Sequence, residues 1–145
     1  MALRPSEIRT ALVTGLGVHL LGSAFYLQAL TFSRFWQTAV VFAVSGLLLA
    51  VAHREQPRRR RLHAALRERG IPSAPISTAA YLALLCLAAL MIALPTALWL
   101  TMQGVPERLD FWLGVGWLCW TALAGLLSWL RWKEAQMLER GARAL

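Results

Sequence analysis

Four long stretches of the chain contain no Asp, Glu, Lys or Arg, and all 22 charged residues lie outside them. The stretches run from Thr10 to Leu30, from Phe35 to Ala52, from Ser77 to Leu100 and from Phe111 to Leu130, which is 21, 18, 24 and 20 residues. At about 1.5 Å per residue, a helix over each stretch can cross a hydrocarbon core of roughly 30 Å. A soluble helix would instead carry a charged stripe along one face. The pattern predicts an all-α membrane protein, with residues 1–145 forming a single domain of four transmembrane helices.

The connections predict that these spans form two antiparallel hairpins. Residues 31–34 join the first two spans, and this connection is so short that the spans must be antiparallel neighbours. Residues 101–110 join the last two spans and contain Gly104 and Pro106 as turn residues. A longer basic segment, residues 53–76, separates the hairpins.

A faint internal repeat accompanies the two hairpins. The matching pairs are Pro5-Ser6 with Pro72-Ser73, Leu30-Thr31 with Leu100-Thr101, and Arg34-Phe35-Trp36 with Asp110-Phe111-Trp112. Since both hairpins would enter from the same side, a duplication predicts a parallel repeat about an axis along the membrane normal. Chance similarity between Leu/Ala-rich helices is the alternative.

The basic residues fall almost entirely on one side of the spans. If the spans alternate in direction, 13 of the 15 Lys and Arg residues lie on the side of the termini, together with five Glu. The other side holds Arg34 and Arg108 with Glu107 and Asp110, so the whole formal charge of +8 lies on the first side. The positive-inside rule makes that side, and both termini, cytoplasmic. The compact, Ala/Leu/Arg-rich chain is typical of a bacterial inner membrane protein. Topology accounts for the charge, and no nucleic-acid partner is expected.

The basic segment predicts a short interfacial helix between the second and third spans. Pro57 suits the first turn of a helix, and Gly70 suits its C-terminal cap. On a membrane surface, Leu62, Ala65 and Leu66 would face the lipid. The expected contacts to anionic lipid at the cytoplasmic face, or to an acidic partner, come from the arginine run Arg58, Arg59, Arg60 and Arg61. Four consecutive arginines cannot share one helical face, so a solvated linker that only fixes topology is an equal alternative.

Small and polar residues recur on one face of the first span. Gly15, His19, Gly22 and Tyr26 follow each other at three- and four-residue spacing. Small residues let another helix approach closely, and a neutral imidazole can bond to a hydroxyl across the contact. We therefore predict that this face packs against a helix.

The fourth span carries a similar stripe. Gly114, Thr121 and Gly125 lie on one helical face. They predict tight helix contacts within the bundle or with a partner protein.

His19 is also a weak candidate cofactor ligand, because ionisable groups deep in a span are costly and often functional. A bis-histidine haem needs a second His within a span, and the chain has none, so Met91 or a partner's residue would have to ligate. A proton relay is the other alternative for His19. Cys86 and Cys119 do not form a C-x-x-C pair. We expect neither a cofactor nor a metal.

No nucleophile and base can be assembled on one membrane face, and no Asp or Glu lies in any span. The predicted function is therefore not enzymatic: an accessory, assembly or scaffold subunit that acts through helix contacts with a membrane-protein partner or a second copy. The alternative is a small homo-oligomeric transporter or channel, with His19 and the kink expected at Pro95 near its pathway. A haem-binding or redox membrane subunit is the less favoured alternative.

Overall fold

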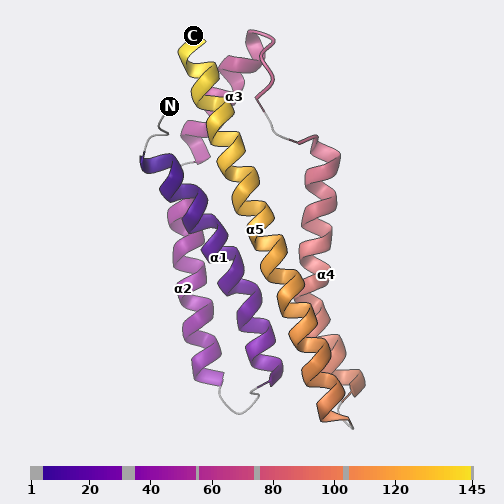
Figure 1. The fold of residues 1–145 in the computed structure, drawn as a ribbon. Helices are drawn as coiled ribbons and strands as arrows, with labels where there is room; N and C mark the ends of the chain where they lie inside the picture. Colours follow the sequence, from indigo (N-terminus) through magenta and orange to yellow (C-terminus); the bar gives the residue numbers. More distant parts are fainter. Residues whose placement is uncertain (1–4, 31–34, 55, 74–75, 103–104, 145) are drawn as a thin grey trace.

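The protein is an all-helical bundle (Figure 1). The computed structural model describes residues 5–30, 35–54, 56–73, 76–102 and 105–144. Of these residues 93% are helical, and none of them lies in a strand. The helices are α1 (Pro5–Leu30), α2 (Phe35–His53), α3 (Gln56–Glu68), α4 (Thr78–Met102) and α5 (Pro106–Ala144). Four of the helices, α1, α2, α4 and α5, contain segments long and apolar enough to cross a membrane. The prediction of an all-α fold is therefore confirmed, and the four predicted spans each correspond to such a helix.

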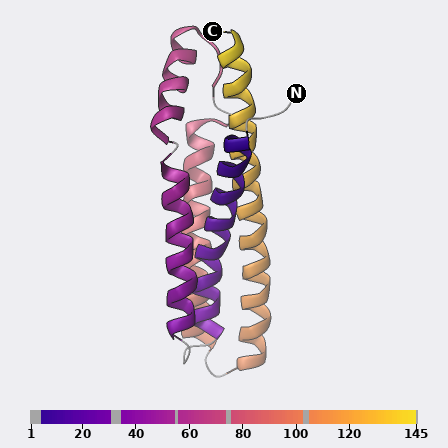
Figure 2. The same cartoon turned by 90° about the vertical axis from the view of Figure 1, so that its left-hand side faces the viewer.

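Helix α1 is the centre of the bundle. It packs against α2 and α5 along much of its length and also contacts α4 (Figures 1 and 2). Helix α4 packs mainly against α5. The short helix α3 lies beside the C-terminal part of α5 at one end of the molecule. Every helix of the bundle is therefore linked to α1 or α5.

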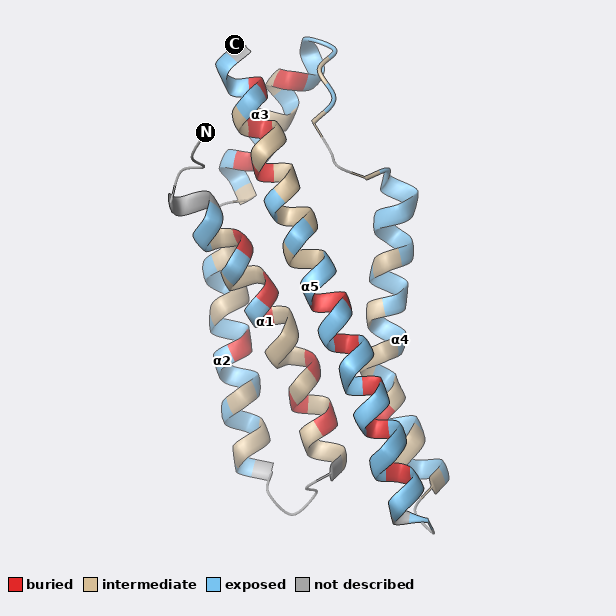
Figure 3. Ribbon diagram, viewed as in Figure 1, coloured by how far each residue is buried: buried red, intermediate tan, exposed pale blue. Residues whose placement is uncertain are grey.

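Side-chain burial follows the same arrangement (Figure 3). The buried cluster consists of Tyr26, Leu109, Leu113, Trp120 and Leu123, all from α1 and α5. Large apolar side chains point outward from α2 and α4, where hardly any residue is buried. Such extensive apolar surface is unusual for a soluble protein and suits contact with hydrocarbon.

Helix α3 confirms the helix expected between Pro57 and Gly70. It ends as predicted, because Gly70 adopts a positive φ of 69°. The Gly70 amide donates to the Arg67 carbonyl, and the Ile71 amide donates to the Leu66 carbonyl. This pair of bonds is the Schellman arrangement, which satisfies carbonyls that a helix end otherwise leaves open.

Helix α5 extends well beyond its apolar stretch. Its 39 residues would measure about 58 Å, whereas a hydrocarbon core is roughly 30 Å thick. The charged part from Arg131 onward therefore projects past the span. At the other end, α4 continues to Met102 and α5 begins at Pro106, so the connection is shorter than the expected residues 101–110. Of the expected turns, residues 31–34 and Gly104 lie outside the described residues.

Candidate functional site

The contact between α1 and α5 is built around Gly22 and Trp120. A Cβ atom at position 22 would overlap the indole ring of Trp120. The indole N–H lies 3.1 Å from the Val18 carbonyl oxygen and 3.2 Å from that of His19, and donates to both. Trp120 is 1% exposed. Glycine at position 22 thus provides the space in which the largest buried side chain packs.

Gly15 makes a second close contact between α1 and α5, about two helical turns from Gly22. A Cβ atom there would lie 2.6 Å from the Cβ of Ser128. The Ser128 hydroxyl donates to the Ala11 carbonyl at 3.0 Å. The predicted small-residue face of α1 therefore includes two glycines that touch α5.

Tyr26 reaches across to α4. Its hydroxyl lies 3.1 Å from the Met91 carbonyl oxygen and donates to it. The ring also lies close to α5, because a Cβ atom at Gly116 would lie 2.8 Å from the same hydroxyl oxygen. Gly116 was not among the predicted packing residues, although it lies only two positions from Gly114.

A further contact that the sequence did not reveal joins α1 to α2. The Ser45 hydroxyl is fully buried and donates to the Gly17 carbonyl at 2.8 Å. A Cβ atom at Gly17 would lie 3.0 Å from Leu49. The signal available in the sequence was the alternation of Gly15 and Gly17, which places small residues on two faces of α1.

The predicted face of α5 borders α1 but is left open. Nothing lies within 4 Å of a Cβ atom built at Gly114 or at Gly125, and the Thr121 side chain is exposed. An open groove of about 340 Å³ runs along this face beside α1. It is lined by Leu12, Gly15, Leu16, His19, Thr121, Ala124, Gly125 and Ser128. Four of the residues predicted for helix packing therefore line one open groove, namely Gly15, His19, Thr121 and Gly125. Gly22 and Tyr26 pack inside the bundle instead, and Gly114 is not among the groove residues.

His19 lies at the wall of this groove. Its Nδ1 atom is 3.5 Å from the Thr121 hydroxyl oxygen, which itself donates to the Trp117 carbonyl at 2.9 Å. The ring lies 5.8 Å from that of Trp117, whose indole N–H donates to the Ser23 hydroxyl. His19 is thus half-buried and available to a group that enters the groove.

The two cysteines are not joined by a disulfide. Cys86 and Cys119 are free and exposed. In the described parts of the chain, no three His, Cys, Asp or Glu side chains are close enough to hold a metal ion.

A polar cluster joins α3 to the projecting part of α5. The Glu134 side chain is 14% exposed, and its Oε2 atom accepts from Arg59 at 3.2 Å and from Arg131 at 3.1 Å. Its Oε1 atom lies 2.7 Å from His63 Nε2, which donates to it. One carboxylate therefore receives donors from both helices and holds α3 on α5.

These partners also set the ionisation of Glu134, which lies beyond the apolar span. Burial by itself would raise the pKa of the Glu134 carboxyl. The hydrogen bond from His63 and the charges of Arg131 and Arg59 outweigh burial and lower this pKa below its usual value of 4.5. Glu134 is consequently a carboxylate in the folded protein at neutral pH.

The four consecutive arginines of α3 differ in their exposure. Arg58, Arg60 and Arg61 are exposed, whereas Arg59 is buried against Glu134. The expectation that Leu66 faces the lipid is wrong, because Leu66 is fully buried and packs where Gly141 of α5 leaves room. Arg59, His63 and Leu66 follow one helical face, so α3 turns that face to α5.

These assignments stand on geometry. Comparison with protein-family models, with curated proteins and with solved structures finds no match.

Proposed function

We propose that the chain is a non-catalytic membrane protein that binds a transmembrane helix of another membrane protein in the groove between α1 and α5. The observation that carries the proposal is the open space at Gly125, which lines the groove together with the exposed Thr121. Gly114 is also open and lies on the same face of α5. A glycine inside a helix costs about 1 kcal/mol relative to alanine. Side chains of the bundle occupy the space next to Gly15, Gly22 and Gly116. Among the described residues, no atom does so at Gly114 or Gly125.

Helix association in a bilayer supports this use of the groove. Lipid tails are as apolar as leucine, so close packing and interhelical hydrogen bonds drive helices together. Gly125 allows a close backbone approach in the groove, and His19 and Thr121 supply polar groups beside it. A single apolar helix with a small or hydroxyl-bearing face fits this surface.

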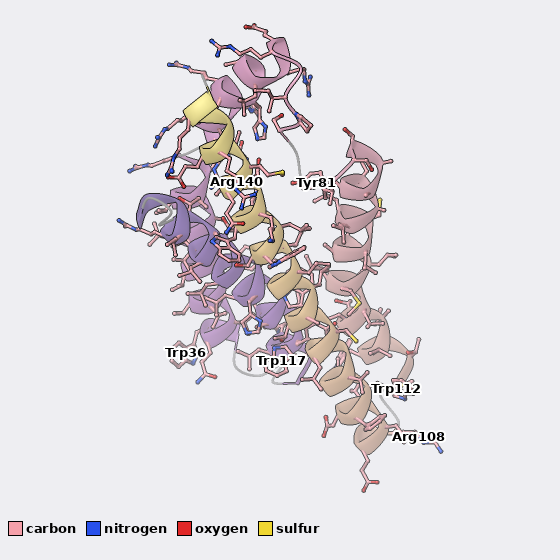
Figure 4. The ribbon with its side chains drawn as sticks, turned by 45° about the horizontal axis from the view of Figure 1, so that its top comes forward. Trp36, Tyr81, Arg108, Trp112, Trp117 and Arg140 are labelled. Atoms are coloured by element: carbon pink, nitrogen blue, oxygen red, sulfur yellow. The ribbon has the colours of Figure 1, made fainter. Side chains whose placement is uncertain are left out.

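The proposed topology places the basic end of the bundle in the cytoplasm. Helix α3 and the last turns of α5 lie at one end, whereas Arg108 and Trp112 lie at the other (Figure 4). We infer two antiparallel hairpins with cytoplasmic termini in an inner membrane, by the positive-inside rule. In a chain whose two cysteines are replaced by serine, Glu107→Cys should react with an impermeant maleimide from outside, and Arg143→Cys should not. The reverse labelling would invert the topology.

Crosslinking in the native membrane tests the proposed contact. The wild-type chain should give a crosslinked species with one partner, which mass spectrometry identifies. Gly125→Leu should abolish that species by filling the groove. Gly46→Leu is the matched control, because Gly46 is equally exposed and has nothing within 4 Å, but lies on α2. A wild-type chain that crosslinks to nothing, or equal loss in both variants, would contradict the proposal.

A small transporter or channel formed by several copies is the second candidate, because His19 lines the surface at which copies would meet. In that case the crosslinked partner is a second copy, and reconstituted vesicles should show flux. His19→Ala should then change the flux. Flux that this substitution leaves unchanged excludes His19 from the pathway.

A further inference from the structure

A pocket of about 530 Å³ lies between α5 and the start of α4. It is lined by Ile76, Trp129, Leu130, Lys133, Gln136, Met137 and Arg140, none of which lines the groove of the proposed function. Helices α4 and α5 diverge toward the end of the molecule that carries α3 (Figure 1). Residues 77–83 are all exposed, and α4 first packs against the core cluster at Leu84. The two helices therefore leave space between them at this end.

The pocket lies at the level where two apolar stretches end. Leu130 is the last residue of the stretch in α5, and Ile76 directly precedes Ser77, the first residue of the stretch in α4. In a bilayer this boundary is the level of the lipid headgroups, where tryptophan is favoured because its ring is apolar and its N–H is polar. Trp129 is 49% exposed and lines the pocket. In a membrane, the pocket is therefore open to the headgroups and to the first part of the lipid chains.

The polar wall of the pocket consists of Lys133, Gln136 and Arg140. These residues follow Trp129 at three- and four-residue spacing, so all four share one face of α5. The Lys133 Nζ atom lies 5.7 Å from the centre of the Trp129 ring and 5.8 Å from that of Trp132. Cation–π attraction holds the ammonium group at the boundary but leaves its charge in place. Arg140 is exposed, and helical side chains lean toward the N-terminus, so its guanidinium can reach back toward the boundary.

Among the described residues, no carboxylate compensates these two charges. Helix α5 has two acidic residues beyond its apolar stretch, and both are paired with other groups. Glu134 is engaged in the polar cluster with α3, and Glu139 pairs with Arg143. The residues that line the pocket include no acidic side chain. Lys133 and Arg140 therefore give the pocket two uncompensated positive charges.

Size and charge together determine which ligand fits. A water molecule occupies about 30 Å³ in the liquid, so the pocket has room for about 18 waters, enough for a phosphodiester and a small alcohol. Ammonium and guanidinium groups both donate charge-assisted hydrogen bonds to phosphate oxygens. The apolar wall favours a ligand that also carries hydrocarbon, and the uncompensated charge favours a net negative headgroup over a zwitterionic one. We infer that this pocket binds the headgroup of an anionic phospholipid, with its phosphate at Lys133 and Arg140 and its chains beside Trp129 and Leu130.

Thermal unfolding of the purified full-length protein in a non-ionic detergent tests the inference, because a ligand that binds the folded state raises the unfolding midpoint. Three probes are titrated: short-chain phosphatidylglycerol, short-chain phosphatidylcholine with the same chains, and inorganic phosphate. Phosphatidylglycerol should raise the midpoint in a saturable way. Phosphatidylcholine lacks the net negative charge and inorganic phosphate lacks the chains, so each should have a much smaller effect.

Charge variants locate the binding site. Lys133→Gln and Arg140→Gln should each weaken the apparent affinity for phosphatidylglycerol by about fivefold, measured against the variant's own unliganded midpoint. Lys133→Arg keeps the charge and should bind like the wild type. The matched control is Arg60→Gln, which removes an equal charge from an exposed arginine of α3 and should not change the affinity.

Several results would overturn the inference. One is the absence of a saturable effect of phosphatidylglycerol, and another is an equal effect of phosphatidylcholine or of inorganic phosphate. Equal weakening in Arg60→Gln would show only a general attraction between charges, and unchanged affinity in a folded Lys133→Gln or Arg140→Gln variant would place the lipid elsewhere. The outcome is independent of the proposed helix contact, because crosslinking reports on Gly125, which does not line this pocket.

Discussion

The Tyr26 hydroxyl of α1 donates a hydrogen bond to the Met91 carbonyl of α4, over 3.1 Å. Met91 precedes Pro95 by four residues, and proline has no amide hydrogen to offer that carbonyl. Helix α4 nevertheless continues through Pro95 to Met102. A phenol from a neighbouring helix therefore replaces the missing backbone donor, which an open carbonyl in apolar surroundings needs.

Tyr26→Phe should lower the free energy of unfolding by about 0.5–1.5 kcal/mol, because it leaves the Met91 carbonyl without this donor. Unfolding in mixed detergent micelles, followed by circular dichroism, measures the change. Tyr81→Phe is the control, since Tyr81 is an exposed tyrosine of α4. In a Pro95→Ala background, where an amide can bond to Met91, the effect of Tyr26→Phe should largely disappear. An undiminished effect there would show that the hydroxyl does not act through this carbonyl.

Gly22→Ala should destabilise the bundle by about 1–3 kcal/mol, because the new methyl group overlaps the buried indole of Trp120. The same unfolding measurement, read by tryptophan fluorescence, should also show a more exposed indole. Gly46→Ala has open space around it and should be neutral or slightly stabilising. Equal effects of the two substitutions would argue against a packed contact at Gly22.

The spans could be predicted because the absence of charge over 18 to 24 residues is a local property of the sequence. The ends of α3 were predictable for a similar reason, since Pro57 and Gly70 act on the backbone next to them. The hairpin topology and the internal repeat stay predictions.

The packing partners could not be predicted from such local patterns. Gly114 and Gly116 are two residues apart, which places them on nearly opposite faces of α5. The three- and four-residue spacing selected the Gly114 face, whereas Tyr26 contacts Gly116. Which of the four arginines is buried depends on Glu134, 75 residues away in the chain from Arg59. Contacts between distant segments determine which glycine packs against Tyr26 and which arginine is buried. Such contacts cannot be read from local patterns in a single sequence.

Glu134→Gln should loosen α3 from α5, because it removes the negative charge that pairs with the buried Arg59. We expect a loss of roughly 1–3 kcal/mol in the local stability of α3. Hydrogen–deuterium exchange at neutral pH measures it as faster exchange in residues 56–68. Glu139→Gln removes an equal charge from the partly exposed pair with Arg143 and should leave α3 protected. Unchanged exchange in the Glu134 variant would mean that the cluster does not hold the helix.

The same carboxylate gives α3 a pH dependence. The pKa of Glu134 is lower in the folded protein than in the unfolded chain, so its contribution to stability is fully present above about pH 4.5. It is lost as the pH falls through the lower folded value. After correction for the intrinsic exchange rate at each pH, the protection of α3 should therefore fall on acidification in the wild type and much less in Glu134→Gln. An equal loss of protection in both would assign the effect to another group.

Leu66→Ala should weaken the docking of α3 by about 2–3 kcal/mol, because Leu66 is fully buried where Gly141 lets α3 approach α5. Leu62→Ala is the matched control: the residue lies on the same helix, is only partly buried, and should cost less than half as much. Exchange in residues 56–68 distinguishes the two variants in lipid nanodiscs. If Leu62→Ala were the more damaging change, α3 would dock on α5 chiefly through Leu62. The pairing of Arg59 with Glu134 would then have to be reassigned, since Arg59 shares the helical face of Leu66.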